Sequence, residues 1–91
     1  MPKRRKSEAA ASEAQQTHRE DELIRQTTGT IYDVMRKKRV TKAELARRMG
    51  RTNAYVSQLL SGDRNLTLRT IADVALALEM HPRVALSDKS R

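Results

Sequence analysis

The stretch from Thr41 to Gly62, TKAELARRMGRTNAYVSQLLSG, predicts two short helices separated by a tight turn. It begins with a capping box, in which the Thr41 hydroxyl caps the first helical turn and Glu44 reaches back toward the start of the helix. The first helix stops at Gly50, because glycine suits the left-handed position that ends a helix.

A second short helix follows the glycine. Thr52 caps it, and it extends from Asn53 to about Leu60 with Val56 and Leu59 turned inward. Ala46 lies where the two helices cross, a place that accommodates only a small side chain. Two short helices joined by a glycine turn have the geometry of a helix-turn-helix motif.

Helices are also predicted on both sides of this stretch. Before it, a helical repeat runs from about Asp21 to Lys38 through Leu23, Thr27, Ile31, Val34 and Met35. After it, Thr67 caps a fourth helix that runs to about Glu79, ahead of a break at Pro82. The fold class is therefore all-α, a compact domain of four to five helices over residues 21–80. Its predicted core consists of Leu45, Ala46, Met49, Val56, Leu59, Ile71, Val74 and Leu78.

The composition excludes several classes of protein. The 91 residues include no cysteine, so disulfides, thiolate zinc sites and thiol catalysis are absent. The two histidines, His18 and His81, are far apart in sequence, and we expect no metal site and no cofactor. No apolar run approaches the ~18 residues that a membrane span needs. With 19 Lys+Arg against 11 Asp+Glu, the net charge is +8, which favours a polyanionic partner.

Positive charge is concentrated between Arg36 and Arg51. This segment carries eight positive residues and one negative residue, Glu44, and so nearly the whole net charge of the chain. One interpretation is that the cluster attracts a polyanion. The other is that the cations stabilise the C-terminal end of a helix dipole and need no ligand. We favour the first, because the cluster continues beyond the predicted helix end.

The outward face of the second short helix carries no charge. If Val56 and Leu59 point inward, the opposite face presents Asn53, Ala54, Ser57 and Gln58. Asparagine and glutamine amides can bind adenine in the major groove, and an alanine methyl suits contact with the thymine methyl. Taken alone, these are ordinary solvated helix residues, but next to a basic cluster and a helix-turn-helix they predict a base-reading surface.

The stretch from Thr41 to Gly62 resembles the phage repressor and Cro type (XRE) helix-turn-helix family, and the resemblance extends over about Ile24 to Leu78. The matching positions are Leu45, Ala46, Gly50, Val56, Leu59, Ser61 and Gly62. The resemblance implies a sequence-specific regulator of transcription, most often a repressor. It inserts the helix over 53–60 into the major groove of a pseudo-palindromic duplex operator. It also implies a cytoplasmic protein of a bacterium or phage, associated with the nucleoid.

The family's site residues transfer by position. Lys42 matches the helix-start residue that contacts a phosphate, and Ser61 falls where the family often has a phosphate-binding asparagine. The positions that face base edges in the family are occupied by Thr52, Asn53, Ala54, Ser57 and Gln58.

Five further residues are candidates for phosphate contacts. Arg51 departs from the family pattern, and either it contacts the DNA backbone or it lies in solvent. The Tyr55 ring either rests on the sugar-phosphate or covers the edge of the core. The amides that follow the Thr67 cap attract anions, and Arg64 and Arg69 would reinforce that attraction.

The two ends of the chain lie outside the predicted helical domain. Residues 1–20 are predicted to be a flexible basic tail whose run Lys3-Arg4-Arg5-Lys6 either follows the DNA as an arm or only aids solubility. Residues 81–91 form a C-terminal segment in which 83–87 suits a short strand pairing across a homodimer. The alternative is that this segment folds back on its own domain. The predicted dimer interface consists of Leu76, Met80, Val84 and Leu86.

A second hypothesis belongs to another class of protein. Small proteins similar to this one include antitoxins, which neutralise a toxin protein and repress their own operon. Nonspecific binding of RNA or DNA through charge alone fails to explain the uncharged outward face of the helix over 53–60. An enzyme is not expected and no catalytic residue is assigned, because Glu44 is accounted for by its cap and neither histidine has an acid-base partner.

Overall fold

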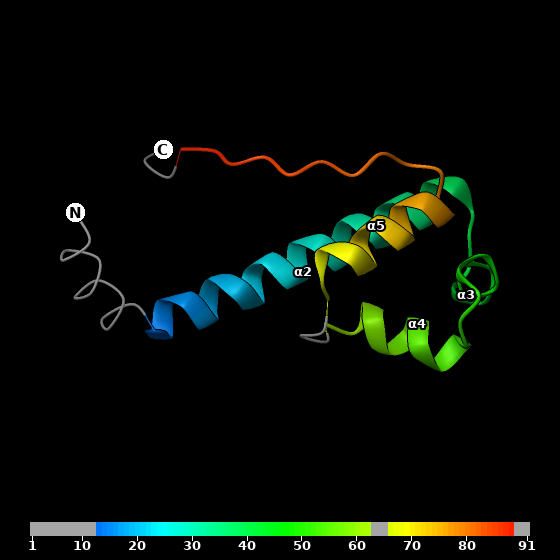
Figure 1. Cartoon of the computed structure of the whole chain (residues 1–91), viewed down its shortest axis with the longest axis horizontal. Coiled ribbons are helices and arrows are strands. Elements are labelled where there is room, and N and C mark those ends of the chain that lie inside the picture. The colour runs from blue at the N-terminus through cyan, green and yellow to red at the C-terminus, as the bar shows by residue number, and fades with distance from the viewer. Residues whose placement is uncertain (1–12, 63–65, 89–91) are drawn as a thin grey trace.

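The computed structural model describes residues 13–62 and 66–88, which form four α-helices. The helices are α2 (Glu13–Lys38), α3 (Lys42–Met49), α4 (Asn53–Leu60) and α5 (Leu68–Ala77). α2 is the long axis of the molecule, and α3 and α4 lie beside its C-terminal half (Figure 1). α3 packs against both α4 and α5. The described residues contain no strand, so the all-α prediction is confirmed.

One hydrophobic core joins all four helices. Its most completely buried side chains are Leu45 of α3, Val56 of α4, Val74 of α5 and Leu78 just after α5. Ile31 and Met35 contribute the face of α2, and the predicted helix-crossing residue, Ala46, is also buried. Helices of 8–10 residues are marginal in isolation, so α3, α4 and α5 depend on this shared core.

Threonine begins each of the three short helices. The Thr41, Thr52 and Thr67 hydroxyl oxygens accept hydrogen bonds from the backbone N–H three residues later, at 3.0–3.1 Å. Each bond satisfies one of the donors that a helix N-terminus leaves unpaired, and such a cap contributes about 1 kcal/mol. All three predicted caps are confirmed.

Three helix ends close in the same way, with a residue in the left-handed conformation. Gly50 (φ 68°) follows α3, Arg39 (φ 57°) follows α2 and Glu79 (φ 59°) follows α5. At each end the next N–H donates back into the last helical turn, as from Arg51 to the Ala46 carbonyl and from Val40 to that of Met35. Only the end at Gly50 uses the residue that adopts this conformation without strain.

The long helix differs from the prediction at its start and in its buried face. It begins at Glu13 rather than near Asp21, so residues 13–20 of the predicted tail are helical. Residues 1–12, including the basic run Lys3 to Lys6, lie outside the described residues. Its buried residues are Ile24, Thr28, Ile31 and Met35, whereas the predicted Leu23 is 62% exposed. The Thr28 hydroxyl is accommodated because it donates to the Ile24 carbonyl at 3.0 Å.

Smaller corrections concern the other helices. Met49 and Ile71 are half-buried rather than buried, and Val40 and Leu60 belong to the core although they were not predicted to. α5 ends at Ala77, two residues before the predicted end. Residues 80–88 are neither helix nor strand and run back along the direction of α2 (Figure 1).

Replacing each of two glycines by alanine should have opposite effects on stability. A Cβ added at Gly50 or at Gly29 would meet no neighbouring group within 4 Å. Packing therefore contributes nothing to the effect of either substitution. Gly50→Ala places a side chain at positive φ and should lower the free energy of unfolding by about 1 kcal/mol. Gly29→Ala, inside α2, should raise it by about 0.5–1 kcal/mol. Urea denaturation of both variants measures this, and effects of the same sign would contradict the assigned turn.

Candidate nucleic-acid interface

The outward face of α4 is composed as the sequence predicts. Val56, Leu59 and Leu60 turn into the core, and they fix the rotation of the helix about its axis. The opposite face is open to solvent at the lower side of the molecule (Figure 1), and its exposed side chains are Asn53, Ala54, Ser57 and Gln58. An α-helix exposed in this manner has the dimensions to enter the major groove of a DNA duplex.

Thr52 has a structural role as well as a place on this surface. Its side chain accepts a hydrogen bond from the Tyr55 N–H at 3.0 Å and thereby begins α4. The hydroxyl proton is still available to donate, and the residue is exposed.

The two tyrosines of the chain each lie beneath a cation. The guanidinium carbon of Arg51 is 4.6 Å from the centre of the Tyr55 ring, and Nζ of Lys42 is 5.8 Å from that of Tyr32. Tyr55 is half-buried and packs against the core, as in the second of the two alternatives given for its ring. Arg51 is exposed beside the N-terminal end of α4, and its side chain is held over that ring.

The remaining phosphate candidates are exposed where they are described. The Ser61 hydroxyl donates to the Gln58 carbonyl at 2.7 Å, so it closes the end of α4. Thr67 caps α5 and Arg69 follows it on the surface. Arg64 lies outside the described residues, as do 63 and 65.

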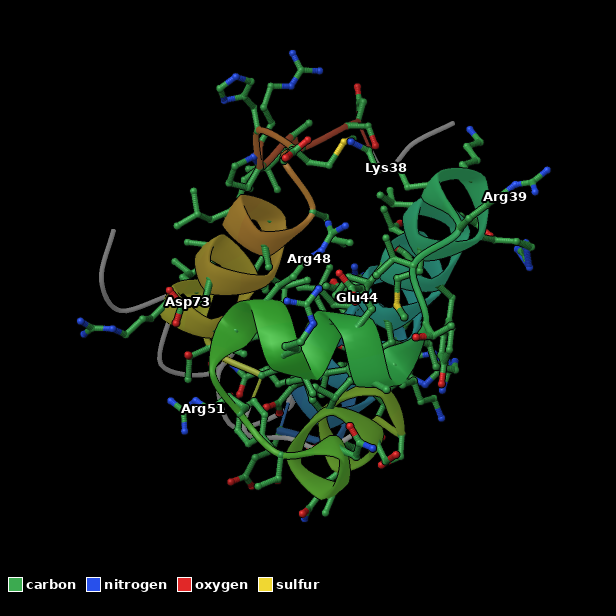
Figure 2. The ribbon with its side chains drawn as sticks, turned by 90° about the vertical axis from the view of Figure 1, so that its right-hand side faces the viewer. Lys38, Arg39, Glu44, Arg48, Arg51 and Asp73 are labelled. Atoms are coloured by element: carbon green, nitrogen blue, oxygen red, sulfur yellow. The ribbon has the colours of Figure 1, made fainter. Side chains whose placement is uncertain are left out.

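The basic cluster of residues 36–51 does not form one surface. Lys38 and Arg39 lie at the end of α2 on one side of α3, and Arg51 lies on the other side at the start of α4 (Figure 2). The last turn of α2 contains Arg36, Lys37 and Lys38, where positive charge stabilises the helix dipole. The helix-dipole interpretation therefore accounts for part of the cluster.

Glu44 and Arg48 connect α3 to the end of α5 (Figure 2). The Glu44 carboxylate pairs with Arg47 and with Nε of Arg48 at 3.0 Å, rather than completing the expected capping box. Nη1 of Arg48 then donates to the Ala77 carbonyl at 3.0 Å. Hydrogen bonds from Arg47 and Arg48 hold the pKa of Glu44 below its usual value. The sequence carries no local signal for this link, since Arg48 and Ala77 are 29 residues apart.

Several apolar side chains are exposed in the last turns of α5 and in the segment that follows it. The four residues predicted to form a dimer interface are all exposed, from 41% for Met80 to 95% for Leu86, and the other two are Leu76 and Val84. None of them belongs to the core. No helix among the described residues has the length and apolar composition to cross a membrane.

Comparison with known proteins identifies the family. A family model described as helix-turn-helix matches residues 31–84, more than half of the chain. The chain therefore belongs to the phage repressor and Cro type (XRE) helix-turn-helix family. It is a transcription regulator that binds double-stranded DNA. Neither a curated protein nor a solved structure matches the chain.

The Glu44 contacts make stability depend on pH. Because its pKa is lowered in the folded state, the Glu44 carboxylate stabilises the fold above its unfolded-state pKa, and this contribution is lost as pH falls through the folded-state value. Glu44→Gln should therefore reduce the free energy of unfolding at pH 7 and have no effect once wild-type Glu44 is protonated. Urea denaturation over a pH series measures the difference.

Asp33→Asn is the matched control for that series. It breaks an ion pair with Arg36 that lies within the exposed surface of α2 and links no second helix, so its effect should be smaller. A Glu44→Gln deficit that stays constant down to acidic pH would show that the charge of Glu44 is not responsible.

Proposed function

We propose that this protein is a sequence-specific repressor that inserts α4 into the major groove of a duplex operator. The observation that carries the proposal is the uncharged, exposed face of α4, which combines Asn53 and Gln58 with the small side chains of Ala54 and Ser57. A surface built only for nonspecific attraction would present Lys and Arg there instead.

The two kinds of contact have separate sources in the proposal. The phosphate contacts come from exposed residues outside the base-reading face, and they set the position of the helix without reading sequence. These residues are Lys42, Arg51, Ser61, Thr67 and Arg69. Base edges are read by the outward residues of α4 together with the donor of Thr52. A protein bound in this way excludes other proteins from the same DNA, so we infer repression as the outcome.

We also propose that the protein acts as a homodimer. A single module buries only ~600–1,000 Å² on DNA, and two-fold operators let a second copy double the sequence that is read. The exposed residues Leu76, Met80, Val84 and Leu86 supply an apolar surface for that copy. In the proposed dimer, residues 83–87, which belong to no helix, pair with their symmetry mate as a strand. The half-sites would then be one helical turn, ~34 Å, apart.

Alanine variants of the outward amides test base reading. An operator is first selected from random duplex DNA by the wild-type protein. Asn53→Ala and Gln58→Ala should each weaken binding to that operator by about 1–3 kcal/mol and binding to random duplex very little. Lys42→Ala should weaken binding to both duplexes alike and reduce the salt slope by about one ion. Equal losses on both duplexes for Asn53→Ala would remove that residue from the base-reading surface.

Sedimentation of the free protein tests the dimer. At micromolar concentration the wild type should have twice the 10.4 kDa mass of the chain, and Leu86→Asp should have the mass of one chain because it places a charge in the interface. Circular dichroism confirms that the variant is folded. A wild-type mass of one chain would contradict the dimer and leave the apolar residues for a different protein, such as the toxin of an antitoxin pair.

A further inference from the structure

We propose that Tyr32 and Tyr55 are positioning residues whose rings hold Lys42 and Arg51 ready for DNA phosphates. The inference rests on the proposed function, since it assumes that a duplex binds along α4. It adds that the affinity of the complex depends on two side chains that themselves make no contact with DNA.

The pairing of rings and cations involves every aromatic residue of the chain. The sequence contains two tyrosines and neither phenylalanine nor tryptophan. Both rings lie within ~6 Å of a cation, the range in which the ring's electron density attracts positive charge. Lys42 is the first residue of α3, and Arg51 immediately precedes the cap of α4, so both cations lie at the start of a helix of the helix-turn-helix.

These two cations differ from the arginines that pair with carboxylates. Arg36 pairs with Asp33, and Arg47 and Arg48 pair with Glu44. Within residues 13–62 and 66–88, neither Lys42 nor Arg51 has a carboxylate at salt-bridge distance. A neutral ring therefore holds each of them in place without cancelling its charge, and the full charge remains for a phosphate.

Contact with a ring also leaves the donors of the cation available. A guanidinium stacked on a ring uses its flat face, while its five N–H groups point outward in its plane and can bind a phosphate in bidentate fashion. An ammonium directs part of its charge at the ring and keeps other N–H groups for an anion. A side chain ordered in advance also loses less conformational entropy when DNA binds.

The two pairs should contribute unequally. The Tyr55 ring is half-buried and packs against the core, so it offers Arg51 a fixed platform at 4.6 Å. The Tyr32 ring is exposed and lies farther from its cation, at 5.8 Å, and lysine is more strongly hydrated than arginine. Loss of the Tyr55 ring should therefore weaken binding more than loss of the Tyr32 ring.

Fluorescence anisotropy with the selected operator duplex tests the proposal. Tyr55→Leu retains an apolar side chain against the core and should weaken binding about two- to fivefold, with a smaller loss for Tyr32→Leu. Tyr55→Phe should recover most of the affinity, because it restores the ring. A loss as large for Tyr55→Phe as for Tyr55→Leu would overturn the proposal, since the hydroxyl would then contact DNA directly.

A double-mutant cycle separates positioning from a general effect on the fold. In an Arg51→Gln background, Tyr55→Leu should cause no further loss, whereas a purely structural defect would persist. Lys38→Gln, which removes the same charge on the other side of α3, is the control and should change affinity less than Arg51→Gln (Figure 2).

The outcomes keep the two proposals distinct. A wild-type protein that binds operator and random duplex equally well contradicts sequence-specific repression. A specific wild-type protein whose affinity is unchanged by Tyr55→Leu, or is reduced equally with and without Arg51, overturns the positioning role alone.

Discussion

The left-handed turn at Gly50 is the constraint on which the rest of the domain depends. One residue, Arg51, separates this glycine from the threonine that caps α4, so the conformation of Gly50 sets the direction in which α4 leaves α3. Leu45 and Val56 can meet in the core only when that direction is correct. The burial of these two side chains fixes the rotation of α4 about its axis. The turn at Gly50 therefore determines which face of α4 is exposed, and this is the face that we propose reads DNA.

Some charged groups hold the helices together, and others are the ones that we propose contact DNA. Glu44 is the sole carboxylate between residues 36 and 51, and it is occupied by Arg47 and Arg48, the second of which also reaches α5. A basic segment with one acidic residue can thus strengthen its own framework, while among residues 13–62 and 66–88 no carboxylate pairs with Lys42 or Arg51. Net charge alone would not distinguish these two uses.

Features with a local cause could be predicted from the sequence, and features with a distant cause could not. The bounds of α4 follow from Thr52 and the end of α3 from Gly50, because caps act within a turn of the helix. Leu23 and Ile24 both fit a helical repeat, and only packing against other helices decides that Ile24 is the buried one. For the same reason, the contact between Arg48 and Ala77 has no signal in either stretch of sequence. The outward face of α4 was predictable because two buried neighbours determine it.

The helix ends at Arg39 and Glu79 bear on how the stability of the protein can evolve or be engineered. Each holds a side chain in a conformation that glycine adopts freely, and neither is among the candidate DNA contacts. Natural proteins retain such strain when stability already exceeds what function requires. Relieving the strain at these two positions would therefore raise the thermostability of the protein and leave the core and the proposed base-reading surface unaltered.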